Sequence, residues 1–323
     1  MRTITLEEHF ANPSFFDGPG REFAEQARQP NNPMAHIPGK LLDLGAARIA
    51  EMDAAGIDMQ VLSLNAPGVE QLEPDEQLAL AKESNEYVAA AVKAHPDRFA
   101  AFAALPLAKP DLAAKELERL MQQGFRGANI NGHVRGRYLD DKFFWPVLEC
   151  AAKIGAPIYL HPTPPPQPVI DAWFGGFSPI VTGMLSRAGY GWHIETAIHI
   201  VRMIVGGVFD RFPNLQLIVG HMGETLPSML QRMDRSLAQP LTKLQRPVSA
   251  YLRENVHYTF SGFNYTAVFL NLLLEVGVDR IMFSADYPYS SQQTARTFLD
   301  NLPASPADRE RIAHGNAARL LKL

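Results

Sequence analysis

The chain has 323 residues, of which 46% are hydrophobic and 20% are charged, and it carries a net charge of -4. This composition indicates a globular protein with enough apolar residues for a large core. The acidic balance, without a basic stripe, excludes nucleic acid and anionic membrane surfaces as expected partners.

Cysteine usage and hydropathy favour a cytoplasmic protein. The single cysteine, Cys150, cannot form an internal disulfide and lies in an apolar helical pattern, so a buried small side chain is its simplest interpretation. Glu7 and Glu8 come too early for a secretory signal peptide. No apolar run is long enough to cross a bilayer.

Strand-like and helix-like patterns alternate along the chain. Eight apolar or alternating runs predict strands, near residues 4–10, 59–64, 99–107, 126–132, 156–162, 215–222, 256–262 and 280–286. Helical spacing lies between them; the stretch 74–94, for example, begins with Pro74 and Asp75 and ends before Pro96. A β-then-α order repeated eight times predicts an α/β fold, a (β/α)8 TIM barrel, as one domain over residues 1–323.

Two segments, 11–40 and 162–189, interrupt this repeat and show no clear period. Each directly follows an expected strand, so both are expected on the loop face of the barrel. Long irregular segments in compact domains usually form lids or contact surfaces. The second segment opens with a proline-rich run and contains Trp173 and Phe177, which favours a pocket wall or a subunit contact over a stiff spacer.

Candidate metal ligands stand at the ends of three expected strands that are far apart in the sequence. Glu7 and His9 are two residues apart, so both should point into the barrel while Glu8 points away. His161 ends the fifth strand and Asp286 the eighth. Singly, each has an ordinary interpretation as an edge or turn residue. Together they predict one divalent cation, Zn²⁺ or Mn²⁺, since histidine ligands disfavour Mg²⁺.

His221 and Glu224 follow the sixth strand, where a helix is expected to start. A nearby carboxylate can raise the pKa of a histidine, so His221 is interpreted first as a proton-transfer residue and second as a ligand. Glu224 has the alternative of a first-turn helix acid. Arg232 is a candidate for binding a substrate carboxylate or for a surface salt bridge. Asn131 could line the pocket, whereas His193 is interpreted as an ordinary helix histidine.

The chain resembles the amidohydrolase superfamily, in the branch of aminocarboxymuconate-semialdehyde decarboxylase and the aromatic acid decarboxylases. The resemblance covers nearly the whole chain and is strongest to the 2,6-dihydroxybenzoate (γ-resorcylate) and 2,3-dihydroxybenzoate decarboxylases. The motifs that carry it are Leu6-Glu7-Glu8-His9-Phe10, Gly136-Arg137-Tyr138-Leu139-Asp140-Asp141, Tyr159-Leu160-His161-Pro162, Glu195-Thr196-Ala197, Gly220-His221-Met222-Gly223-Glu224, Phe283-Ser284-Ala285-Asp286-Tyr287-Pro288 and Gly315-Asn316-Ala317-Ala318-Arg319-Leu320-Leu321.

This resemblance implies a distorted barrel that assembles as a homodimer or homotetramer, with His221 and Glu224 in an acid–base network. The metal ligands that it implies are Glu7, His9, His161 and Asp286. Two stretches depart from the family pattern. Tyr289-Ser290 stands where the phenolic acid decarboxylases often have Phe-Glu, and Gly191-Trp192-His193 is unusual.

The expected activity is decarboxylation of a hydroxylated aromatic acid whose carboxylate and ortho hydroxyl bind the metal. Asp286, or His221 through Glu224, would protonate the ring carbon before CO₂ leaves. The side chains expected to hold the ring, or otherwise to pack in the core, are Phe10, Trp173, Phe177 and Tyr289. The alternative is hydrolysis of an ester, lactone or amide by metal-activated water. A metal-bound scaffold without catalysis is disfavoured because an acid–base pair stands beside the ligands.

Overall fold

The computed structural model describes all residues, 1–323, and places all eight expected strands. The strands are β1 (Ile4–Phe10), β2 (Met59–Leu64), β3 (Phe99–Ala101), β4 (Ala103–Ala104), β5 (Ala128–Asn131), β6 (Ile158–His161), β7 (Leu217–Val219), β8 (Val256–Thr259) and β9 (Ile281–Met282). The expected strand 99–107 is divided into β3 and β4, so the structure has nine strands.

All the strands pair in parallel, in chain order, within two sheets: β1-β2-β3 and β4 through β9. Individual backbone hydrogen bonds continue across both breaks. Phe102 N donates to Leu62 O at 2.9 Å, and Leu6 N donates to Phe283 O at 3.2 Å. The strands therefore surround one interior in the manner of a distorted (β/α)8 barrel.

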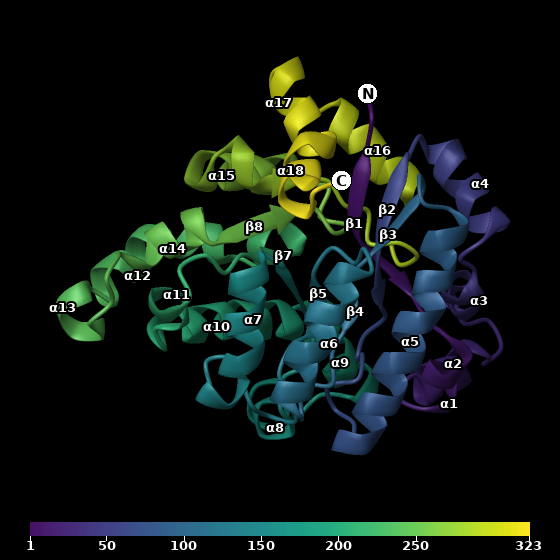
Figure 1. The fold of residues 1–323 in the computed structure, drawn as a ribbon, viewed down its shortest axis with the longest axis horizontal. Coiled ribbons are helices and arrows are strands. Elements are labelled where there is room, and N and C mark those ends of the chain that lie inside the picture. Colours follow the sequence, from purple (N-terminus) through teal and green to yellow (C-terminus); the bar gives the residue numbers. More distant parts are fainter.

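Helices separate successive strands, except for the divided pair β3 and β4, as the alternating patterns predict (Figure 1). The main ones are α4 (Ala46–Ala55), α5 (Pro74–Ala94), α6 (Pro110–Gln122), α7 (Trp145–Ile154), α10 (Gly191–Val205), α12 (Leu230–Ser236), α14 (Val248–Glu254), α15 (Thr266–Val276), α16 (Gln292–Asp300) and α18 (Asn316–Leu321). The prediction for 74–94 agrees with the bounds of α5, whose start carries a capping box between Glu73 and Glu76. None of the helices combines the length and apolar character needed to cross a bilayer.

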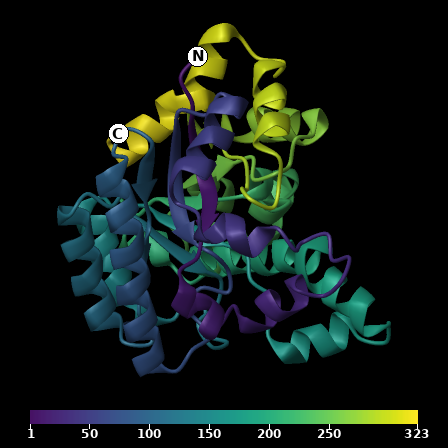
Figure 2. The same ribbon diagram turned by 90° about the vertical axis from the view of Figure 1, so that its right-hand side faces the viewer.

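The two interrupting segments contain short helices, which the sequence did not suggest. Residues 11–40 form α1 (Pro13–Asp17), α2 (Arg21–Ala27) and α3 (Ile37–Leu42), and residues 162–189 form α8 (Gln167–Phe174), α9 (Pro179–Met184) and η2 (Leu185–Gly189). Each is too short for a helical period to stand out in the sequence. Figures 1 and 2 show both segments at the end of the molecule opposite the two chain termini.

Two apolar clusters hold the strands in place. The larger one includes buried residues of both the strands and the surrounding helices. The smaller one lies at the amino-terminal end of the strands and includes Ala317 and Leu321 of α18; its other members are Ile4, Leu6, Met59, Val61, Ala100, Phe102, Tyr159, Ile218 and Met282. This smaller cluster forms the floor of the interior, so polar side chains farther along the strands lie on a packed apolar base.

A buried arginine fixes β1 from behind. The side chain of Arg48 on α4 is fully buried; its Nε donates to Gln60 Oε1 at 2.6 Å and its Nη1 to His9 O at 2.7 Å. Its guanidinium lies 4.5 Å from the centre of the Tyr287 ring. Glu8 is also buried and accepts from two backbone N–H groups after β9, at 2.8 and 3.2 Å. Burial raises the pKa of Glu8 to about 8 and lowers that of Arg48 to about 10.

We predict that Arg48→Met lowers the free energy of unfolding by about 2–6 kcal/mol, because Gln60 Oε1 and His9 O each lose a buried donor. Urea unfolding at pH 7 measures the loss. The matched control is Arg119→Met, whose exposed pair with Glu116 is worth less than about 1 kcal/mol. Equal losses in the two variants would contradict a structural role for Arg48.

Candidate metal centre

The side chain of Glu7 enters the interior at a bulge in β1. The ladder between β1 and β2 shifts register between Thr5 and Glu8, and Glu7 has a φ of 66°. Glu7 and His9 face a common space, as expected, while Glu8 points to the segment after β9. The reason that Glu7 faces this space differs from the predicted one: a bulge, and not the regular alternation of a strand, directs its carboxylate inward.

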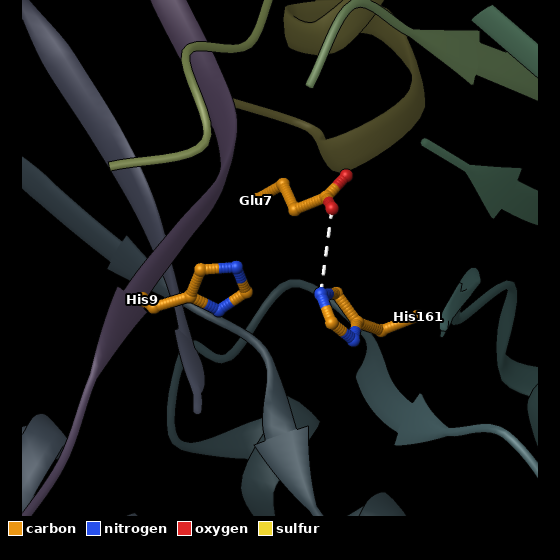
Figure 3. Close-up of side chains that lie close together, drawn as sticks. All are labelled: Glu7, His9 and His161. Carbon is orange, nitrogen blue, oxygen red and sulfur yellow. Dashed lines mark ion pairs between the residues drawn. The ribbon is translucent and has the colours of Figure 1, made fainter. Parts of the chain in front are cut away.

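Three buried side chains meet in this space. One ligand-type atom from each of Glu7, His9 and His161 lies within 4.8 Å of the others, and Figure 3 shows the Glu7 carboxylate and the two imidazoles converging from β1 and β6. Glu7 Oε1 is 3.4 Å from His161 Nε2, and Asp286 Oδ1 is 3.3 Å from His9 Nε2. Two ligands at about 2.1 Å from one cation, roughly 90–109° apart, are separated by about 3.0–3.4 Å. The observed spacings therefore suit a shared cation.

The two oxygens of Glu7 have different surroundings. Oε2 accepts hydrogen bonds from the hydroxyls of Tyr159 and Ser261, and both hydroxyls also lie 2.8 Å from Thr259 Oγ1. Oε1 is buried and has no hydrogen-bond partner. An unpartnered oxygen of a buried carboxylate is costly, and a cation at this position removes that cost.

The histidines of the cluster are in the state that a cation requires. His161 Nδ1 lies 2.8 Å from Pro162 O, to which it donates, so the lone pair of Nε2 faces Glu7. Burial lowers the pKa of His9 to about 4 and that of His161 to about 3, so both imidazoles are neutral at pH 7. Burial raises the pKa of Asp286 to about 7, against the opposing charge of His221. The donor set of nitrogen and oxygen atoms fits a divalent cation.

His221 and Glu224 are brought together by a left-handed turn. All five residues from His221 to Thr225 have positive φ values, between 49° and 89°. The expectation that a right-handed helix starts here is wrong: the regular helix α12 begins only at Leu230, after a short 3-10 turn. Left-handed residues other than glycine are costly, by about 1–2 kcal/mol each, and such strain is concentrated at functional sites.

The turn makes a buried charged pair. Glu224 Oε1 is 2.7 Å from His221 Nδ1, and His221 Nε2 lies 3.8 Å from Glu7 Oε1. Burial opposes the charged form of His221, but the charges of Glu224 and Glu7 outweigh it and raise the pKa of His221 above its ordinary value. Burial acts to raise the pKa of Glu224, yet His221 and His193 bring it below its ordinary value. His193 joins this pair through Glu224 Oε2, at 2.5 Å, a contact that the sequence analysis missed.

Tyr289 lies beside the cluster and is 38% exposed. Its ring centre is 5.7 Å from that of His9 and 6.5 Å from that of Phe23, and its hydroxyl donates to Asn65 Oδ1 at 2.8 Å. Tyr289 therefore stays a candidate wall of a substrate pocket. Phe23 and Asn65 are neighbours of this wall that the sequence analysis did not select.

The structure does not bring the other predicted substrate residues into this cluster. Phe10 is in the core with its ring stacked on Tyr87, because it follows the inward-facing His9, and this agrees with the core alternative given for it. Arg232 is exposed on α12. Trp173 and Phe177 are exposed on the 162–189 segment.

Asn131 is buried beside His161 in the ladder between β5 and β6. Its backbone N–H donates to Glu70 Oε1 at 2.8 Å, and its side-chain oxygen has no partner. A role for Asn131 toward a substrate stays a prediction.

Comparisons with known proteins identify the family of this chain. The family model of the amidohydrolases matches residues 35–323. A γ-resorcylate decarboxylase from Polaromonas sp. is 36% identical over 335 residues, which cover 99% of this chain and 98% of the relative.

Two solved structures have the same fold. A dihydroxybenzoic acid decarboxylase from Polaromonas sp., crystallised with manganese and the inhibitor 2-nitroresorcinol, is 35% identical with a TM-score of 0.90, and the match covers 100% of this chain and 97% of that one. A 5-carboxyvanillate decarboxylase from Novosphingobium aromaticivorans, also with manganese, is 33% identical with a TM-score of 0.91, covering 100% and 96%. This chain therefore belongs to the amidohydrolase family.

Proposed function

We propose that this protein catalyses the metal-dependent, non-oxidative decarboxylation of a hydroxylated aromatic carboxylic acid. The observation that carries the proposal is the unpartnered buried oxygen of Glu7, which faces two neutral imidazoles in a site of cation-like spacing. Relatives aligned over nearly the whole chain are decarboxylases of dihydroxybenzoates, which supports the hydroxylated aromatic class of substrate.

The residues proposed to hold one divalent cation, zinc or manganese, come from three strand ends. They are Glu7, His9, His161 and Asp286. When bound, the cation supplies a positive charge that binds and polarises the carboxylate and a neighbouring hydroxyl of the substrate. Glu7 Oε2 is held by hydroxyls from β6 and the β8 end, so its Oε1 keeps one direction without rearrangement.

Asp286 is the proposed proton donor to the ring. It follows β9 with a φ of 65°, and its side chain is 17% exposed, so it reaches the space above the cluster. Its carboxyl proton goes to the ring carbon that carries the carboxylate. The electron pair of the breaking C–C bond then restores the aromatic ring as CO₂ leaves. A positioned acid contributes about 10²–10⁴-fold to the rate.

His221 and Glu224 are proposed to serve the same step from the other side. The raised pKa of His221 keeps a positive charge in a buried site, close to where an anionic substrate must be held. Glu224 holds that imidazole by its Nδ1, so Nε2 faces the interior and Glu7. The pair can orient the substrate or return a proton to Asp286 after turnover.

A second copy of this chain is the proposed partner. Large apolar side chains are exposed on α8, on α9 and at positions beside these helices and η2, and patches of this kind usually mark interfaces. These side chains are Trp173, Phe177, Ile180, Val181, Met184 and Tyr190. We propose that this face forms a homodimer or homotetramer contact. A cytoplasmic location stays a prediction from cysteine usage.

The cation assignment predicts that His161→Ala no longer binds zinc stoichiometrically. The substitution removes one of the three clustered ligand atoms and leaves only those of Glu7 and His9. Elemental analysis after dialysis gives the metal content per chain. The control is His36→Ala, which removes an exposed histidine and should keep the metal content of the parent. Full metal in His161→Ala would show that the ligands are elsewhere.

The decarboxylase assignment predicts metal-dependent CO₂ release from at least one hydroxybenzoate by the manganese- or zinc-loaded protein. Asp286→Asn should lower kcat by at least about 10²-fold, because its amide cannot donate an acidic proton. A panel of mono- and dihydroxybenzoates measures both. Silence across the panel with stoichiometric metal, together with turnover of esters or lactones, would favour the hydrolase alternative.

The interface assignment predicts that Ile180→Asp, which places a charge on a side chain that is 79% exposed, lowers the molar mass measured by light scattering. Leu112→Asp on α6, 41% exposed, is the control and should keep the assembly of the parent. A parent that is monomeric at micromolar concentration would contradict this use of the face.

A further inference from the structure

The carboxylate of Glu224 is held by two histidines, of which the proposed mechanism uses one. Its Oε1 is 2.7 Å from His221 Nδ1 and its Oε2 is 2.5 Å from His193 Nδ1. The Glu224 side chain is fully buried and that of His193 is 10% exposed. His193 lies in the first turn of α10, directly after the 162–189 segment.

This group is a chain of hydrogen bonds and not a second cation site. The atoms lie within the range that a cation could bridge, but separations of 2.5 and 2.7 Å are those of charge-assisted hydrogen bonds. They are shorter than the roughly 3.0–3.4 Å between two ligands of one cation. A Nδ1 atom that donates its proton to Glu224 has no lone pair left for a metal.

The carboxylate of Glu224 fixes one proton of His193. An ionised carboxylate can only accept, so His193 Nδ1 donates to Glu224 Oε2. His193 Nε2 lies 3.3 Å from the indole Nε1 of Trp192, which can only donate, and 3.3 Å from Ala188 O, which can only accept. Nδ1 carries its proton with either of these partners on Nε2.

Packing holds the three rings of this group in place. The His193 and His221 ring centres are 4.7 Å apart at an angle of 73°. Both rings also lie edge-on to Phe263, at 5.2 and 5.3 Å. Neither imidazole can turn far without losing these contacts, so the hydrogen bonds to Glu224 are kept in one geometry.

We propose that His193 is a positioning residue for the decarboxylation. It holds Glu224 Oε2, which keeps Oε1 on His221 Nδ1 and so aims His221 Nε2 at the interior. Without His193, one oxygen of a buried carboxylate loses its only donor and Glu224 can rotate away from His221. This inference rests on the proposed function for its effect on turnover, although the hydrogen-bonded chain itself can be tested without activity.

The kinetic test compares His193→Phe with His193→Asn in the full-length, metal-loaded protein. Phe keeps a ring but has no donor, so kcat should fall by about 10-fold or more with little change in KM. The amide nitrogen of Asn stands close to the place of Nδ1, so kcat should return to within about threefold of the parent. An Asn variant as slow as the Phe variant, or an effect confined to KM, would overturn the proposal.

A double-mutant cycle with Glu224→Gln separates positioning from direct contact with substrate. If His193 acts through Glu224, adding His193→Phe to Glu224→Gln should change kcat by less than about twofold. If the fold-loss of kcat in the double variant equals the product of the losses in the two single variants, His193 acts on the substrate independently of Glu224.

Proton NMR of the zinc-loaded protein tests the chain independently of turnover. Buried imidazole N–H protons donated to a carboxylate should give two resonances downfield of the amides. His193→Phe should lose one, and Glu224→Gln should lose at least one, because an amide has only one acceptor oxygen. If the parent releases no CO₂, the proposed function fails while these resonances still decide whether His193 holds Glu224. An unchanged spectrum in His193→Phe would overturn the inference.

Discussion

The carboxylate of Glu7 is the constraint on which the site depends. One oxygen is satisfied by the hydroxyls of Tyr159 and Ser261, while the other is buried without a partner. Burial keeps the imidazoles of His9 and His161 neutral, and the charged imidazole of His221 lies 3.8 Å from this oxygen, beyond hydrogen-bond distance. A cation supplies the missing direct partner, and the same cation then provides the anchor that an aromatic carboxylate requires. The requirement for metal thus follows from this one oxygen, whereas the proposed class of substrate rests on the similar decarboxylases.

The position of the Glu7 carboxylate and of its neighbours depends on strained backbone conformations at the strand ends. Glu7, His221, Glu224 and Asp286 all have positive φ values. Glycine would adopt each of these conformations at lower cost. Together the four residues direct side chains from three strand ends into one space. The apolar floor below and the buried Arg48 behind β1 hold these strained ends in position. The rigid core therefore keeps the side chains of the site in fixed positions, as preorganised metal sites require.

Much of this arrangement could be predicted from the sequence, for identifiable reasons. Strands buried on both sides give apolar runs, so all eight strands were predicted in place, although runs such as 280–286 are longer than the strand Ile281–Met282. The helix 74–94 has clear start and stop residues, so α5 was predicted with its bounds. Tyr159 could also have been found, because it stands two residues before His161 on the same strand. The bulge at Glu7 and the left-handed turn at His221–Thr225 have no local signature, since only one of the five turn residues is glycine. His193 depends on a contact across 31 residues of sequence, which no periodicity reveals.

The central claim is that each chain holds one cation, at Glu7, and that the Glu224 group is a hydrogen-bonded chain. Anomalous X-ray scattering from a crystal of the manganese-loaded protein tests this most directly. We predict one anomalous peak per chain, among Glu7, His9, His161 and Asp286. A second peak of similar height between His193, His221 and Glu224, or a single peak placed there, would contradict both assignments.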